Sequence, residues 1–152
     1  MRLNNYWLIA TIATSVFTIA YFSFNPSYER SLEAKFHYML GDYKQAQELA
    51  TEAFEMNKYN RMASTIMTQS QTAMKFVNYI DEAKKYMSEI AVIASADGVS
   101  DAQRAKVKMI CEIMIESHVK VTATVLTDKA LVEEAKSYKE KFEKLHDEIT
   151  SR

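Results

Sequence analysis

Residues 40–60 read LGDYKQAQELATEAFEMNKYN, and this stretch decides how the chain folds. Gly41 and Asp42 interrupt a sequence that has helical spacing on both sides. Glycine adopts the left-handed conformation that ends a helix, and aspartate caps the free amides of the helix that follows. The pair therefore predicts a tight turn that folds one helix back on the next.

The helix before this turn is predicted from its apolar side chains. Tyr28, Leu32, Phe36 and Met39 recur at spacings of four, four and three residues. This is the period of one helical face. We therefore expect a helix over residues 28–40 with a single apolar stripe.

The helix after the turn, Tyr43–Met56, carries small side chains along one face. Ala46, Ala50 and Ala53 follow one another at spacings of four and three residues. Small side chains let two helices approach closely. The alanines therefore predict the seam along which the two helices pack.

Residues 27–60 resemble a tetratricopeptide repeat, a helical hairpin that stacks into solenoids. The matching residues are Ala34 in the first helix, then Gly41, Asp42, Tyr43, Ala46, Ala53, Phe54, Met56 and Asn60. The departures are Arg30 and Glu33-Ala34 in place of the usual tryptophan and Leu-Gly pair, and Lys58 in place of a proline. The resemblance covers about a quarter of the chain. It implies that a protein segment binds in a groove lined by the first helices.

Beyond residue 60 the repeat pattern weakens. A third helix is predicted by the apolar residues Met62, Ile66, Met67 and Met74. Residues 77–94, VNYIDEAKKYMSEIAVIA, predict a fourth helix. We expect residues 61–96 to form a degenerate second unit.

Two more helices are predicted over residues 100–150. Ser100 and Gln103 form a capping box for a helix from Asp101 to about Leu126. The end of that helix, VKVTATVL, alternates like a strand, but no second strand-like run exists to pair with it, so a frayed or extended helix end is expected. The Asp97-Gly98 pair predicts a turn before this helix. Thr127-Asp128 is the predicted cap of the last helix.

The last helix has a narrow apolar stripe. Its members are Leu131, Ala135, Tyr138, Phe142, Leu145 and Ile149. Such a stripe is typical of a helix that caps the end of a helical stack, or of one that pairs with a second copy of itself. Both alternatives stay open at this point.

Tyr6–Phe24 has no charge, glycine or proline over 19 residues. A helix of this length spans roughly 28 Å, close to the ~30 Å hydrocarbon thickness of a bilayer. The hydroxyls of Thr11, Thr14, Ser15 and Thr18 can bond back to carbonyls one turn earlier in a helix. Aromatic residues lie at both ends, as at the two interfaces of a membrane: Tyr6, Trp7, Tyr21, Phe22 and Phe24. We expect a membrane anchor.

Two alternatives to the anchor remain open. A cleaved secretory signal would use Thr18-Ile19-Ala20 as its best cleavage site, but its apolar stretch exceeds the usual length and only Arg2 precedes it. A buried core helix would leave this much uniformly apolar surface without a polar face. For the anchor, the helical domain is expected beyond the inner membrane, in the periplasm of a bacterial source, because a short N-terminal tail usually stays cytoplasmic.

The predicted architecture is therefore all-α. A single transmembrane helix within residues 1–25 precedes a tetratricopeptide-like helical-hairpin solenoid of about six helices in residues 26–152. Asn25-Pro26 separates the two parts, and Ser27 is the predicted cap of the first solenoid helix.

Charge and composition exclude several classes of function. With 19 basic and 20 acidic residues the formal charge is −1, so no basic field exists to hold nucleic acid. Two glycines cannot build a phosphate-binding loop. His37, His118 and His146 lack a second ligand at metal-binding spacing, and Cys111 sits among apolar neighbours as a buried thiol. We expect no enzyme, cofactor or metal.

The resemblance implies the positions of a partner-binding groove. Carried onto this sequence, they are Tyr28, Ser31, Lys35, Tyr38 and Met39 from the first helix, and Met62, Thr65 and Gln69 from the next unit. Lys35 and Tyr38 are the strongest candidates, because a cation and an amphipathic aromatic ring hold an extended partner by charge and stacking.

These features predict a membrane-anchored scaffold or assembly factor of a bacterial envelope complex, in motility, secretion or division machinery. Its partners would be other membrane or envelope proteins, with the bilayer held through Tyr6–Phe24. The alternatives are a membrane-tethered chaperone for secreted or membrane proteins, or a homo-oligomeric structural protein joined through the last helix.

Overall fold

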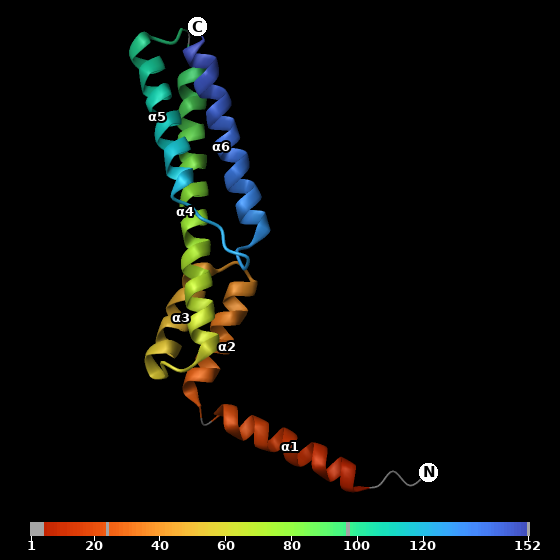
Figure 1. Ribbon diagram of the computed structural model, residues 1–152. Coiled ribbons are helices and arrows are strands. Elements are labelled where there is room, and N and C mark those ends of the chain that lie inside the picture. Colours follow the sequence, from red (N-terminus) through yellow and green to blue (C-terminus); the bar gives the residue numbers. More distant parts are fainter. Residues whose placement is uncertain (1–4, 24, 97, 152) are drawn as a thin grey trace. The chain divides into compact units, whose positions relative to one another are not determined.

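The computed structural model describes residues 5–23, 25–96 and 98–151 (Figure 1). Within these ranges the chain forms six helices and no strand, which confirms the all-α prediction. The helices are α1 (Asn5–Ser23), α2 (Pro26–Met39), α3 (Tyr43–Met56), α4 (Arg61–Ala94), α5 (Asp101–Val119) and α6 (Lys129–Thr150). The predictions for Arg2, Phe24 and Asp97, and for the side chains of Tyr21 and Phe22, lie outside the described residues.

The chain divides into two compact units, Met1–Ser70 and Gln71–Arg152. In the first unit α2, α3 and the first part of α4 pack together. In the second unit the rest of α4 packs with α5 and α6. The candidate site lies in the first unit.

The turn between α2 and α3 is confirmed in detail. Gly41 has a φ of +80°, the left-handed conformation that ends α2. The side chain of Asp42 accepts a hydrogen bond from the Gln45 amide at 3.2 Å, so it caps α3. Because only residues 40–42 separate the two helices, they fold back on each other.

The seam between α2 and α3 consists of small side chains, as predicted. Ala34, Ala46, Ala50 and Ala53 are all fully buried. Leu49 and, from α4, Ile66 complete this core. Close helix packing follows directly, because methyl side chains keep the two backbones near each other.

The apolar stripe of α2 does not face this core. Leu32, Phe36 and Met39 are 45%, 60% and 75% exposed. The face of α2 that is buried carries Ser27, Ser31 and Ala34 instead. The physical reason is the short distance to α3, which admits only small side chains at the contact.

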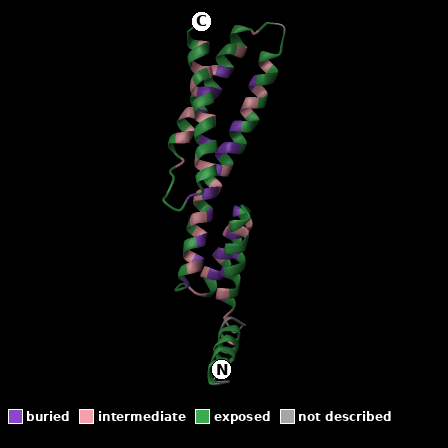
Figure 2. Cartoon of the chain, turned by 90° about the vertical axis from the view of Figure 1, so that its right-hand side faces the viewer, coloured by how far each residue is buried: buried purple, intermediate pink, exposed green. Residues whose placement is uncertain are grey.

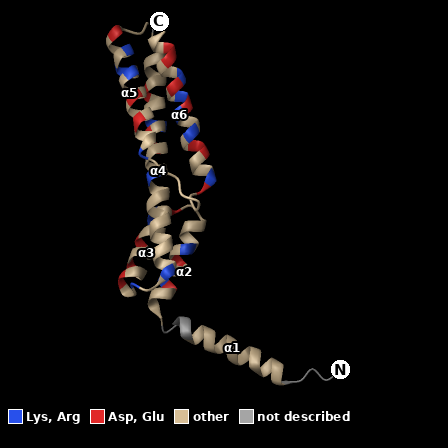
Figure 3. Ribbon diagram, viewed as in Figure 1, with Lys and Arg blue, Asp and Glu red and all other residues tan. Residues whose placement is uncertain are grey.

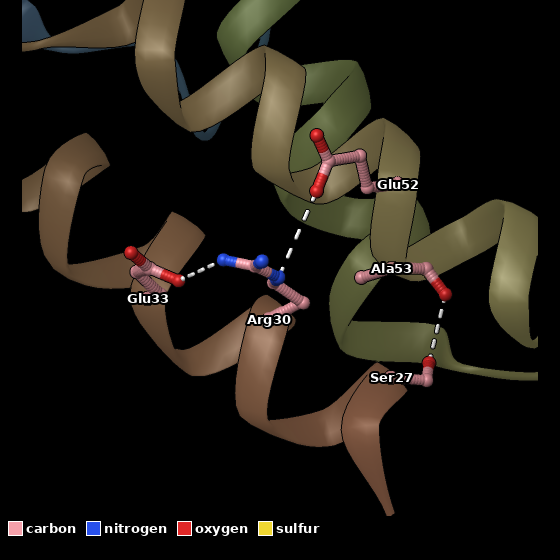
Figure 4. A network of polar contacts seen from close by, with 5 residues as sticks. All are labelled: Ser27, Arg30, Glu33, Glu52 and Ala53. Carbon is pink, nitrogen blue, oxygen red and sulfur yellow. Dashed lines mark hydrogen bonds and ion pairs between the residues drawn. The ribbon is translucent and has the colours of Figure 1, made fainter.

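Ser27 does not cap α2, contrary to prediction. The helix begins at Pro26, with Asn25 at the cap position, and Ser27 is buried within the first turn. Its hydroxyl donates a hydrogen bond of 2.7 Å to the carbonyl of Ala53 near the end of α3 (Figure 4). Ser27 therefore joins the start of one helix to the end of the other.

Asn60 completes a buried polar junction at the start of α4. Its Nδ2 donates to the Ser27 carbonyl at 3.1 Å, the Ser27 hydroxyl at 2.9 Å and the Ser31 hydroxyl at 3.2 Å. Its Oδ1 accepts from the Ala63 amide at 3.1 Å, which caps α4. The Asn60 side chain thus joins α2 to the start of α4, and the Ser27 hydroxyl extends the junction to α3.

The third and fourth helices expected over residues 61–94 are one helix, α4, of 34 residues. The prediction of a second helical pair within 61–96 is therefore wrong. No glycine or proline occurs between Arg61 and Ala94, so nothing in the backbone requires a break. After α1, the described residues form five helices rather than about six.

The core of the second unit lies between α4, α5 and α6. Its largest fully buried side chains are Phe76, Phe142 and Met114, and Cys111 is fully buried as predicted. The predicted capping box of Ser100 and Gln103 is present, and the Asp128 side chain accepts from the Ala130 amide at 2.9 Å.

Two further details of the second unit bear on the predictions. Helix α5 ends at Val119, seven residues before the expected Leu126, and residues 121–124 that follow are neither helix nor strand. The apolar stripe of α6 packs against its own core through Leu131, Tyr138, Leu145 and Ile149, with Ala135 and Phe142 fully buried.

Helix α1 is exposed along nearly all of its described side chains (Figure 2). The hydroxyls of Thr11, Thr14, Ser15 and Thr18 bond to backbone carbonyls three or four residues earlier at 2.8 to 3.0 Å, as predicted. Within the described residues, no helix reaches the combined length and apolar character that crossing a membrane requires.

Candidate functional site: a groove between α2 and α4

A groove with a volume of about 470 Å³ runs between α2 and the first part of α4. Helix α2 contributes Lys35, Tyr38 and Met39, and α4 contributes Arg61, Met62, Thr65, Ile66 and Gln69. These positions recur at three and four residues along each helix, so each set occupies one helical face. The two faces meet because the α2–α3 turn and the Asn60 junction hold α2 beside the start of α4.

Six of the eight residues predicted for a partner-binding groove line this one. They are Lys35, Tyr38, Met39, Met62, Thr65 and Gln69. The structure therefore brings together positions that are up to 34 residues apart in the sequence. Their role in binding a partner stays a prediction.

Tyr28 and Ser31 do not line the groove. Tyr28 is half-buried. Ser31 is fully buried, and its hydroxyl donates to the Tyr28 carbonyl at 2.9 Å and accepts from Asn60. The expectation that Ser31 is an exposed groove residue is wrong: it belongs to the helix contact.

Two residues that line the groove, Arg61 and Ile66, were not predicted from the sequence. Arg61 lies one helical turn before Thr65, so the spacing of the predicted α4 positions could have identified it. Ile66 was assigned to the third helix as an apolar residue but not to the groove. It is buried and forms the apolar floor.

Tyr38 is held in place by its neighbours. Its ring contacts the Tyr43 ring edge to face, with 5.3 Å between the centroids. Tyr38 also packs against the core that contains Ala34 and Ile66. An aromatic side chain fixed in this way offers a contact surface without a large loss of side-chain entropy on binding.

The charges on the two sides of α2 differ. Toward α3, Arg30 pairs with Glu33 at 2.9 Å and with Glu52 at 3.7 Å (Figure 4). Toward α4, Lys35 and Arg61 line the groove, and no ion pair involves either of them within the part of the chain described. The groove lining contains no aspartate or glutamate.

A second hollow, in the other unit, is lined by acidic rather than basic side chains. It measures about 640 Å³ between α5 and α6, and its acidic lining residues are Glu112, Glu116, Glu143 and Asp147, beside His146. There His146 Nε2 lies 3.4 Å from a Glu112 oxygen, and Glu143 pairs with Lys139 at 3.0 Å. Acidic side chains dominate this hollow, and cations lie in the α2–α4 groove.

The titratable groups with shifted pKa values lie outside the groove. Burial raises the pKa of Tyr79 to about 12, helped by the charge of Glu143, and its hydroxyl has no hydrogen-bond partner among the residues that the structure describes. Burial and the charge of Lys139 lower the pKa of His118, whose ring contacts that of Tyr79. No group of three or more potential metal ligands is found within the described ranges.

The groove therefore combines an apolar floor, a fixed aromatic ring, two methionines and two cations. Tyr, Met and Arg are side chains enriched at protein interfaces. No model of a known protein family, no curated protein sequence and no solved structure matches this chain.

Proposed function

We propose that this chain is a membrane-tethered protein-interaction module that docks a segment of another protein in the α2–α4 groove. In this role it serves as a scaffold or assembly factor of an envelope complex, such as a motility, secretion or division machine. The observation that carries the proposal is the convergence of Lys35, Tyr38, Met39, Met62 and Thr65 on one groove.

The openness of the groove favours a protein segment over a small molecule. Lys35, Met39, Arg61 and Thr65 are all exposed. Small-molecule sites enclose most of their ligand, whereas protein segments bind on shallow, accessible surfaces around a few anchoring side chains. Methionine suits such a surface because its flexible, polarizable side chain adapts to the shape of a partner.

The α2–α3 hairpin supports the comparison with a single tetratricopeptide-like unit. The left-handed Gly41 and the buried alanine seam of this hairpin are among the features on which the resemblance rests. In that family the first helix of each hairpin lines the binding groove, and the proposal gives this role to α2. The proposal needs only this one hairpin and the helix that follows it.

The membrane tether is proposed for α1 and Phe24. Large apolar side chains of α1, such as Ile9, Ile12, Val16 and Phe17, are at least half exposed, and α1 carries no charged residue (Figure 3). Its hydroxyls are already bonded to its own backbone, which lowers the free energy needed to place them in lipid. Exposed apolar surface of this extent needs cover from lipid or protein.

The docking proposal is tested by crosslinking in native membranes. A photoreactive amino acid replaces Thr65, which lies in the groove, or Lys44, which is exposed on α3, and crosslinked proteins are identified by mass spectrometry. We expect one consistent partner from the Thr65 position and its loss on adding Met39→Ala with Tyr38→Ala. The same proteins from both positions, or none from Thr65, would contradict the proposal.

The same experiment distinguishes a chaperone from the proposed scaffold. A chaperone for secreted or membrane proteins would crosslink weakly to many unrelated clients rather than to one stoichiometric partner. Such a pattern from the Thr65 position would replace the scaffold proposal.

The tether is tested by extraction and labelling. Wild-type chain should stay with membranes in alkaline carbonate, and Ile12→Asp with Val16→Asp should release it, whereas Val125→Asp in the second unit should not. A Ser151→Cys variant then reports the side of the membrane on which the domain lies, because the native Cys111 is fully buried. Labelling in intact cells by an impermeant thiol reagent is expected for the periplasmic orientation.

A further inference from the structure

The groove has a positive charge that no carboxylate of the described residues neutralises by an ion pair. Arg30, the other cation described on α2 besides Lys35, is already paired with Glu33 and Glu52. Lys35 from α2 and Arg61 from α4 both line the groove, and no carboxylate is among its described lining residues. Two cations above the apolar floor of Ile66 favour a negatively charged occupant.

An apolar ridge on α2 continues from the groove toward solvent. Met39 lines the groove, and Leu32 lies seven residues earlier, so the two occupy nearly the same face of the helix. Phe36 lies between them in sequence and is also exposed. Single exposed apolar residues are ordinary, but a contiguous set beside a groove marks an interaction surface.

From these two features we infer that the groove takes an acidic, amphipathic protein segment. Its Asp or Glu side chains pair with Lys35 and Arg61, and its apolar side chains cover Met39, Leu32 and Phe36. This inference rests on the proposed docking function and names the chemistry of the partner. It goes beyond that function, because a neutral or basic segment would equally satisfy docking alone.

Other polyanions fit these features less well. Binding of nucleic acid generally requires several phosphate contacts, and this chain has two unpaired groove cations and a net charge of −1. Phosphates would also leave the ridge of Leu32, Phe36 and Met39 uncovered. A protein segment with alternating acidic and apolar residues satisfies both features.

The expected preference is modest, because both cations are exposed to solvent. An exposed ion pair changes affinity by a few-fold, so two pairs change it by roughly tenfold at low salt. Screening shortens the reach of such charges to about 8 Å at physiological ionic strength. The preference should therefore shrink as salt is added, whereas apolar contacts on the ridge should not weaken.

The test uses the full chain in an uncharged detergent and fluorescence anisotropy. The probes are short labelled peptides in which leucine alternates with glutamate, glutamine or lysine. We expect the glutamate peptide to bind roughly tenfold more tightly than the lysine peptide at low salt. Lys35→Glu with Arg61→Glu should abolish or reverse that order.

A matched control reverses the charge of two exposed lysines outside the groove. Lys44→Glu with Lys75→Glu makes the same change in net charge, and neither residue lines the groove or has an ion pair within the described ranges. This variant should keep the preference for the glutamate peptide. Equal loss in both double variants would show that net charge alone decides binding, and would overturn the inference.

Two other outcomes would also overturn it. One is equal binding, or no binding, of the three peptides by the wild-type chain. The other is flotation of the chain with anionic phosphatidylglycerol vesicles that depends on Lys35 and Arg61 while the peptides fail to bind, which would assign the cations to lipid headgroups. The docking proposal would survive either result if crosslinking from Thr65 still captured one partner, so the two failures are distinguishable.

Discussion

Replacing Asn60 by alanine should lower the free energy of opening of α2, α3 and the start of α4 more than the replacement of an exposed residue does. The change removes the acceptor for the Ala63 amide and the donor to the Ser27 carbonyl and hydroxyl. Loss of a helix cap costs about 1 kcal/mol, and a buried carbonyl left without a donor costs about 1–3 kcal/mol. The free energy of opening should therefore fall by about 2–4 kcal/mol.

Hydrogen exchange measured by mass spectrometry is the appropriate assay, because it reports the opening of individual helices. Each 1.4 kcal/mol corresponds to tenfold, so amides of α2 and α3 should exchange at least roughly thirtyfold faster in Asn60→Ala. Asn57→Ala is the matched control. The Asn57 side chain accepts one exposed hydrogen bond, from the Tyr59 amide at 3.0 Å. Its loss should cost below about 1 kcal/mol.

A double variant examines whether the junction acts as a unit. Ser27→Ala removes a hydroxyl that Asn60 also contacts, so the two substitutions share an interaction. The double variant should therefore change the opening free energy by less than the sum of the two single variants. Exchange in Asn60→Ala that is no faster than in Asn57→Ala would refute the reasoning that a buried polar junction holds these helices.

Three further substitutions have expected outcomes. Gly41→Ala should lower the free energy of unfolding by about 1–2 kcal/mol, measured by urea denaturation, because its φ of +80° disfavours a side chain even though no atom lies within 4 Å of the added methyl group. Ala50→Leu should cost about 1–3 kcal/mol in the same assay, because the fully buried seam has no room for a larger side chain. Tyr79→Phe should leave stability at neutral pH unchanged or slightly raised, because it removes a buried hydroxyl without a partner. The pKa of Tyr79 rises from 10.0 to about 12 on folding, so the unfolded chain releases this proton first as pH increases. Wild-type stability should therefore fall relative to Tyr79→Phe between pH 10 and 12, and parallel pH profiles of the two proteins would contradict this assignment.

The turns and caps were predictable because they depend on local chemistry. Gly41 takes the left-handed conformation, Asp42 caps α3, and Ser100 with Gln103 forms a capping box. Each of these involves residues at most a few positions apart. Such short-range rules hold whatever the rest of the chain does.

The buried face of α2 was not predictable from its apolar spacing. Leu32 and Phe36 repeat with helical period but are exposed, whereas Ser27 and Ser31 are buried. Period identifies a helix and a stripe, but the partner helix decides which stripe is covered. The alanines of α3 were the informative signal, since a seam of methyl groups requires small residues on the facing helix as well.

The lengths of α4 and α5 differ from those expected from the sequence. The 34 residues of α4 contain no glycine or proline, yet its two apolar runs were each interpreted as a separate helix. Helix α5 ends at Val119, before a run that contains Val121, Thr122 and Thr124. Branching at the β-carbon lowers helix propensity, and this explains the early end.

The positions of the groove residues were predicted through the resemblance to a tetratricopeptide repeat, in which the first helices line the groove. Six of the eight positions carried over in this way, among them Lys35, Tyr38 and Met62, line the groove. The burial of Ser31 could not be foreseen in this way. It depends on Asn60, whose side chain reaches into the helix contact from 29 residues away.

The polar junction also determines the register in which the hairpin closes. A seam of alanines presents nearly the same surface after a shift of one helical turn, about 5.4 Å, so apolar packing alone would tolerate sliding. The amide of Asn60 meets both Ser27 and Ser31 in only one alignment, and a slipped hairpin would bury these groups unpaired. Correct alignment of α2 is thereby coupled to the placement of every residue that it contributes to the groove.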